Sequence, residues 1–137
     1  MSEPPSTDDL STDAARREAG TRTRREVLGD AWVDRAAAGT TPFSADFQDF
    51  LTRVAWGDVW QRPGLARRER SIATLSVLVA LRHWDEFALH VRAAVRNGLT
   101  EAEVAEVLLH TAVYAGVPAA NHAFRVAATV LAELRGD

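Results

Sequence analysis

Helix-stop and helix-start signals follow one another closely in the second half of this 137-residue chain, and no strand pattern of any length separates them. Asn97 and Gly98 form a left-handed C-terminal cap signal. Thr100 and Glu103 form a capping box for the helix that follows. The run 116–118 (Gly-Val-Pro) then breaks that helix and opens the last one. We therefore predict an all-α fold.

Hydrophobic periodicity places the helices between these signals. We expect helices over about 12–28, 31–38, 67–82, 84–96, 101–114 and 118–134. Another helix starts at Pro42 and Ser44, and its apolar residues at helical spacing are expected to face a core: Phe43, Phe47, Phe50, Leu51, Val54 and Ala55. The stretch 56–65 (WGDVWQRPGL) is expected to be an ordered loop, because its two tryptophans need burial. Residues 1–10 are expected to form a disordered tail ahead of one domain over 11–137.

The composition excludes several kinds of chemistry. The chain has no cysteine, which removes disulfides, thiolate nucleophiles and redox pairs. All 16 basic side chains are arginine, so Schiff-base chemistry on a lysine is excluded. The net charge of −3 gives no electrostatic case for nucleic acid. No apolar run is long enough to span a membrane and no secretory signal is present, so we expect a cytoplasmic protein.

The segment 82–94 (RHWDEFALHVRAA) brings titratable side chains to an apolar helix face. His83, Glu86 and His90 are spaced so that all three lie on one side, together with Phe87 and other apolar residues. Three interpretations stay open from the spacing. His90 is a core histidine satisfied by a carboxylate, or the three residues bind a divalent metal, or Glu86 and His90 form an acid–base pair.

Other polar residues are candidates for the same chemistry. His110 precedes Tyr114 by one helical turn, and His122 lies in the last helix; each is read first as structural, although either could line a cleft. The arginines are more numerous than solubility requires, and one or two could clamp a substrate carboxylate bidentately. The arginines considered for this are Arg53, Arg62, Arg67, Arg70, Arg92 and Arg96.

Four stretches, taken in order, resemble the carboxymuconolactone decarboxylase family. They are RVAWGDVWQRPGL, RRERSIATLSVLVAL, ALHVRAAVRNGLT and EVLLHTAVYAGVPAANHAF, with VLGDAWVDRA upstream. The resemblance runs from about residue 24 to 132. It implies an alkylhydroperoxidase-D-like helical fold that assembles as a homo-trimer or homo-hexamer. In that superfamily a CxxCxxxH motif carries thiol chemistry; aligned on His90, it places His83 and Glu86 where the cysteines would be, so peroxidase chemistry is excluded here.

The activity that this resemblance implies is the decarboxylation of 4-carboxymuconolactone to 3-oxoadipate enol-lactone, in the protocatechuate branch of the β-ketoadipate pathway. No cofactor and no metal are expected, because the lactone carbonyl accepts the electrons. The substrate, a small lactone dicarboxylate, is the only partner expected besides further copies of the chain. Alternatives are a non-catalytic helical oligomer that binds a small acid, or a decarboxylase of another lactone or β-keto acid.

Roles follow from this reaction as hypotheses. His90 delivers a proton to carbon, and Glu86 orients it and keeps it protonated. A hydrogen bond to the lactone oxygen comes from His83, His110 or Tyr114. Arg53 or Arg62, which flank the WGDVW segment, hold a substrate carboxylate, and Trp56 contributes to the same binding region.

Overall fold

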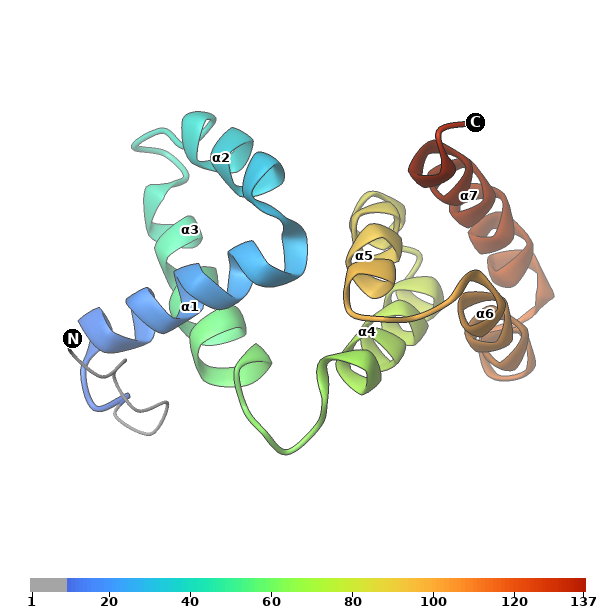
Figure 1. The fold of residues 1–137 in the computed structure, drawn as a ribbon, viewed down its shortest axis with the longest axis horizontal. Coiled ribbons are helices and arrows are strands. Elements are labelled where there is room, and N and C mark those ends of the chain that lie inside the picture. The colour runs from blue at the N-terminus through green and yellow to red at the C-terminus, as the bar shows by residue number, and fades with distance from the viewer. Residues whose placement is uncertain (1–9) are drawn as a thin grey trace. The chain divides into compact units, whose positions relative to one another are not determined.

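The computed structural model describes residues 10–137, so the expected tail over 1–10 lies, apart from Leu10, outside the described residues. The described backbone divides into two compact units on either side of Gly64, residues 10–64 and 65–137, which we call the N-terminal unit and the C-terminal unit (Figure 1). Between residues 10 and 137 all regular structure is helical, which confirms the all-α prediction. The single domain expected over 11–137 stays a prediction.

The N-terminal unit contains helix α1 (Asp13–Leu28), α2 (Asp30–Ala38), α3 (Ala45–Leu51) and a π-helix, η1 (Thr52–Trp60). Its most extensive contact is the crossing of α1 and η1. Two glycines permit it: a methyl group added at Gly20 would overlap the carbonyl oxygen of Thr52, and one added at Gly57 would lie 2.5 Å from the carbonyl oxygen of Arg16. The glycine inside α1 is therefore required for the packing of α1 against η1.

The π-helix corrects two expectations. The loop expected over 56–65 is wrong in its first half, because helical structure continues to Trp60, where the rings of Trp56 and Trp60 stack at 5.2 Å. Phe43, Phe47 and Phe50 do not face a core; they are 98%, 62% and 53% exposed. The reason is that α3 buries no residue and packs mainly on η1, so its apolar periodicity marks an exposed face.

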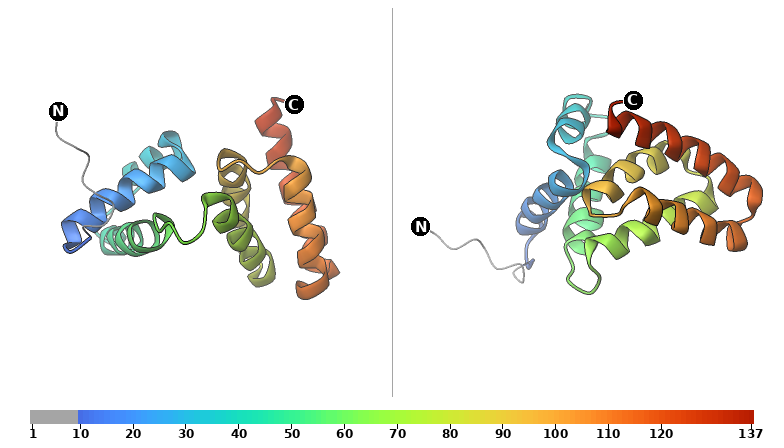
Figure 2. Two further views of the ribbon diagram at one scale, coloured as in Figure 1. Left: turned by 60° about the horizontal axis from the view of Figure 1, so that its bottom comes forward. Right: turned by 45° about the vertical axis from the view of Figure 1, so that its right-hand side comes forward.

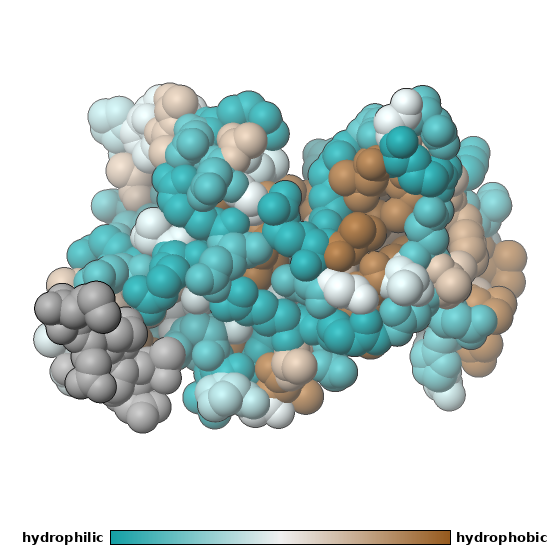
Figure 3. All heavy atoms as spheres, viewed as in Figure 1, coloured by the Kyte–Doolittle hydropathy of each residue, from teal (hydrophilic) through white to brown (hydrophobic). Residues whose placement is uncertain are grey.

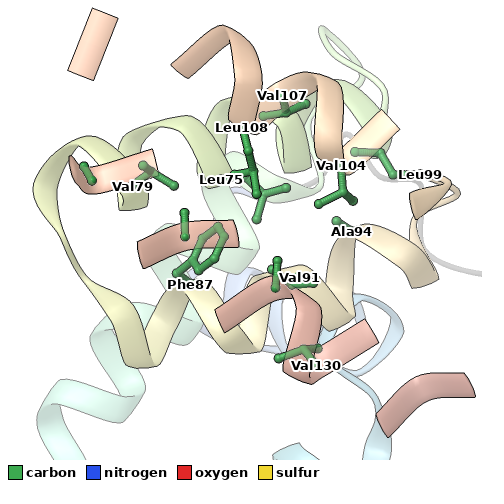
Figure 4. Packing of buried hydrophobic residues seen from close by; sticks show 13 residues of the cluster. Leu75, Val79, Phe87, Val91, Ala94, Leu99, Val104, Val107, Leu108 and Val130 are labelled. Carbon is green, nitrogen blue, oxygen red and sulfur yellow. The ribbon is translucent and has the colours of Figure 1, made fainter. Parts of the chain in front are cut away.

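The C-terminal unit contains α4 (Arg67–Leu81), α5 (Trp84–Arg96), α6 (Glu101–Ala115) and α7 (Val117–Arg135). Helix α5 packs against the other three, and Figure 2 shows these helices from two further sides. Their facing side chains form one apolar core, seen in Figure 4. Its fully buried members include Leu75 from α4, Phe87 and Val91 from α5, and Leu108 from α6.

Two polar contacts close the turns of this unit. The capping box that the sequence predicted at Thr100 and Glu103 is present. Glu103 also accepts hydrogen bonds from Arg68, whose Nη1 donates to the carbonyl oxygen of Gly98 at 2.6 Å. The basic first turn of α4, unfavourable for the helix dipole, thus serves to tie α4 to the turn between α5 and α6. Among residues 10–137, no helix is long and apolar enough to cross a membrane.

The glycine crossing gives a stability prediction. Gly20→Ala improves helix propensity but forces α1 and η1 apart, so we expect a net loss of about 1–3 kcal/mol in the free energy of unfolding, measured by urea denaturation. Gly39→Ala is the matched control, because its added methyl group would meet only ordinary contacts, the nearest at 3.5 Å. Equal stability of the two variants would contradict the claim that the crossing of α1 and η1 requires glycine at position 20.

Candidate functional site

The candidate site is built on α5, which starts directly after a tight turn from α4. Arg82 adopts a left-handed conformation (φ 60°, ψ 38°) that ends α4, and the backbone N–H of His83 donates to the carbonyl oxygen of Leu78 at 2.9 Å. His83 is the N-cap of α5. Its side chain is exposed and makes no capping bond, so it lies at the edge of the helix rather than within the buried face.

His90 lies two turns into α5, between core positions. Phe87, Val91 and Ala94 of the same helix are completely buried, and His90 is partly buried beside them. Its Nδ1 atom is shielded from solvent. The helix positions an imidazole at the margin of the apolar core, as the spacing of the sequence predicted.

Two opposing effects set the pKa of His90. Burial disfavours the imidazolium and lowers the pKa from 6.5 to about 4, while the negative charge of Glu86 partly opposes this shift. Glu86 itself is exposed in the first turn of α5. The charge of Glu86 favours the imidazolium, the direction expected for the pair, and burial acts in the opposite direction. The roles of Glu86 and His90 stay predictions.

The spacing of His83, Glu86 and His90 does not produce a three-ligand cluster. Over residues 10–137 no group of three or more His, Cys, Asp or Glu side chains is gathered in a way that could hold a metal ion. The reason is that His83 precedes the helix and is exposed, whereas His90 is drawn toward the core. The structure thus gives no geometry for the metal interpretation.

A groove on the same unit contains another candidate. It has a volume of about 500 Å³ and is lined by residues of α4 and α6, among them Ser76, Glu106 and His110. The ring of His110 lies 5.2 Å from that of Tyr114, which is 81% exposed. His122 contacts the indole of Trp84 at 4.3 Å, in keeping with its structural interpretation.

The remaining residues to which the reaction assigned a role belong to the N-terminal unit. Arg53 donates from Nε to Asp49 at 2.8 Å, so it already has a carboxylate partner. Trp56 is buried at 6% exposure, and Arg62 is exposed just beyond η1. The binding roles of Arg53, Trp56 and Arg62 stay predictions.

Sequence reasoning missed one arginine of the N-terminal unit. Arg24 is only 8% exposed and stacks on the ring of Trp32 at 5.3 Å. A signal was available: Arg24 recurs at helical spacing with Gly20, Val27 and Leu28, all of them buried. An arginine at such a position is a buried charge rather than a solubilising one.

The chain is similar in sequence to known decarboxylases. The sequence model of the carboxymuconolactone decarboxylase family matches residues 45–129. The chain is 45% identical over 122 residues to 4-carboxymuconolactone decarboxylase of Acinetobacter baylyi, covering 89% of this chain and 91% of that protein. It is also 45% identical over 107 residues to nitrosuccinic acid decarboxylase npaB of Metarhizium robertsii, covering 78% and 75% respectively.

The burial of His90 predicts a pH-dependent stability. Below pH 6.5 the unfolded chain binds a proton on His90 that the folded chain accepts only near pH 4. The free energy of unfolding should therefore fall by about 1.4 kcal/mol per pH unit as the pH drops from 6.5 toward 5. Urea denaturation of the wild type and His90→Gln measures this, and the variant should lose that part of the slope. Equal slopes would show that His90 titrates normally.

Proposed function

The chain belongs to the carboxymuconolactone decarboxylase family, and on that premise we propose that it converts 4-carboxymuconolactone to 3-oxoadipate enol-lactone and carbon dioxide. The observation that carries the proposal is the 45% identity to an enzyme of that activity, which extends over 91% of that enzyme. The partly buried imidazole on α5, coupled to a carboxylate one turn away, suits the proton transfer that the reaction requires.

The reaction needs little beyond binding and one proton. When the ring carboxylate leaves as carbon dioxide, its bonding electrons move through the ring double bond to the lactone carbonyl, which becomes an enolate oxygen. A proton then adds to carbon and restores the carbonyl. The protein must hold a dianion, place a hydrogen-bond donor at the enolate oxygen and supply that proton.

His90 is the proposed proton donor. Its pKa of about 4 leaves it neutral in the unoccupied chain. A dianionic substrate bound beside it adds negative charge to that of Glu86, and both charges raise the pKa of the imidazole, so that it takes up a proton on binding. Glu86 thus acts by favouring the imidazolium, and the proton transfer to carbon returns His90 to its neutral form.

The other proposed roles follow the position of each side chain. The exposed His83, His110 and Tyr114 are the candidate donors to the lactone oxygen, and His110 lines a groove. Arg53 and Arg62 are the candidate carboxylate ligands. Because Arg53 is paired with Asp49, its binding of substrate would require exchange of that partner.

A second substrate has a specific observation in its favour. The similarity to nitrosuccinic acid decarboxylase npaB has the same identity, 45%, although over less of the chain. Nitrosuccinic acid is also a small dicarboxylic acid with an electron sink beside a carboxylate, since a nitro group accepts the electrons as a nitronate. The two substrates differ in shape and in the group that accepts the electrons, but both require the protein to bind two carboxylates.

We also propose a homo-oligomer, a trimer or a hexamer. The C-terminal unit exposes large apolar side chains that a second copy could bury, among them Val113, Tyr114 and Val117 at 77%, 81% and 70% exposure. Figure 3 shows apolar side chains at the surface of this unit. A cytoplasmic location and the absence of nucleic-acid partners stay predictions from the sequence.

The proposed activity is tested directly by turnover. We expect the purified chain to release carbon dioxide from 4-carboxymuconolactone, generated in situ from 3-carboxymuconate by its cycloisomerase, at equal rates with and without EDTA. Nitrosuccinic acid is assayed in parallel under the same conditions. Faster turnover of nitrosuccinic acid would favour the second substrate, and no turnover of either would contradict the proposal.

The roles of His90 and Glu86 are tested by two variants. His90→Gln should lower kcat by about 10²–10⁴, the usual contribution of a positioned acid–base group. Glu86→Gln should lower kcat less and move the basic limb of the pH–rate profile to lower pH, because the imidazolium loses a stabilising charge.

The control for these variants is His122→Gln, which removes an imidazole of the same unit that stacks on Trp84. It should retain most of its turnover. If His90→Gln instead keeps its kcat, or if its loss of activity only follows a loss of folded protein by circular dichroism, then His90 is a core histidine.

A further inference from the structure

The N-terminal unit contains a cavity that the decarboxylation proposal does not use. It has a volume of about 310 Å³ and lies among α1, α2, α3 and η1. That volume is at the lower end of the range for small-molecule sites, about 300–1,000 Å³. Polar residues of α1 and α3 line it, including Arg24 and Gln48, while Val33 and Ala37 of α2 provide an apolar wall.

Arg24 is the unusual member of this lining. Its side chain is 92% shielded from solvent, with 8% exposure, and burial lowers its pKa. Its contacts within residues 10–137 are a hydrogen bond from Nη2 to Gln48 Oε1 at 3.3 Å and the face of Trp32. Over the same residues its buried Nε has no hydrogen-bond partner, and no carboxylate pairs with the guanidinium. A buried cation in this state lacks the counter-charge that normally accompanies one.

The other two arginines of the cavity are already neutralised. Arg17 pairs with Asp49 at 2.5 Å, and Arg25 pairs with Asp30 at 3.2 Å and Asp34 at 2.9 Å. The carboxylate of Asp49 is fully ionised, because Arg17 and Arg53 hold its pKa at about 2. Arg24 therefore contributes the uncompensated positive charge of the lining.

The number of available donors limits what kind of anion fits. The hydroxyl groups of Thr21, Thr40 and Thr52 donate to backbone carbonyl oxygens, so their protons are committed. Gln48 accepts from Arg24 through its amide oxygen, which leaves its NH₂ group to donate. One guanidinium and one amide suit a singly charged carboxylate, whereas a phosphate dianion requires more donors.

We propose that this cavity binds a small aliphatic carboxylate, whose charged end pairs with Arg24 and the amide of Gln48 and whose apolar part lies against Val33 and Ala37. The carboxylate supplies the counter-charge that the guanidinium lacks. This site rests on the N-terminal unit alone and goes beyond the proposed decarboxylation at His90.

Isothermal titration calorimetry with butyrate as the probe tests the site without an activity assay. We expect wild-type protein to bind butyrate, and Arg24→Met to bind it about tenfold more weakly or worse, the loss expected for a charge-assisted hydrogen bond. Arg22→Met is the matched control: Arg22 is an exposed arginine of α1 outside this cavity, and its loss changes the net charge equally. That variant should bind butyrate as the wild type does.

A second variant remains informative if Arg24→Met fails to fold. Gln48→Glu places a carboxylate of nearly the same shape beside Arg24, so the chain provides its own counter-charge. We expect its Tm to rise and its butyrate binding to disappear. No butyrate binding by the wild type, equal binding by Arg24→Met, or tighter binding of inorganic phosphate than of butyrate would each overturn the proposal.

An effect of butyrate on turnover counts for this site only if Arg24→Met abolishes it, because butyrate can also compete for the carboxylate ligands of the decarboxylation substrate. The calorimetric result stands whether or not the chain decarboxylates 4-carboxymuconolactone.

Discussion

The burial of one face of α5 determines most of what the C-terminal unit can do. Phe87, Val91 and Ala94 are completely buried on the face of α5 that packs against the other helices of the unit. His90 is carried to the core margin by the same helical repeat, and Glu86 is left at the surface one turn earlier. The packing of α5 thus determines the pKa of His90. The core desolvates the imidazole and lowers the pKa, and the exposed carboxylate of Glu86 raises it.

The N-terminal unit depends on a different constraint, the close backbone approach of α1 and η1 at Gly20 and Gly57. Because the helices touch there, the neighbouring turns of α1 can present long side chains to the adjoining helices. Arg16 reaches Asp58 of η1 and Arg17 reaches Asp49 of α3. Arg24 lies on the same helix but has no carboxylate partner among the described residues. It therefore differs from Arg16 and Arg17, whose charges are neutralised.

The sequence was informative where the signal is local. The capping box at Thr100 and the glycine turns gave the helices of the C-terminal unit nearly to the residue, since caps depend on a few neighbouring atoms. It failed where the outcome depends on what packs opposite. The stripe of Phe43, Phe47 and Phe50 has the periodicity of a core face but is exposed. The glycine and tryptophans after it suggested a loop where a π-helix forms.

Spacing placed Glu86 near His90 but gave no measure of desolvation, so the lowering of the pKa of His90 by burial could not be predicted.

The neutrality of His90 bears on how such a site can select its substrate. Because burial lowers the pKa of His90, a bound anion that adds negative charge beside the imidazole would raise the fraction of His90 that is protonated. A monoanion of similar shape would raise the pKa less, so a smaller fraction of the imidazole would carry a proton. Both relatives are decarboxylases, and the two substrates that their names give carry two carboxylates beside different electron sinks. In the proposed mechanism, the number of negative charges on the bound acid therefore sets how much of His90 is protonated.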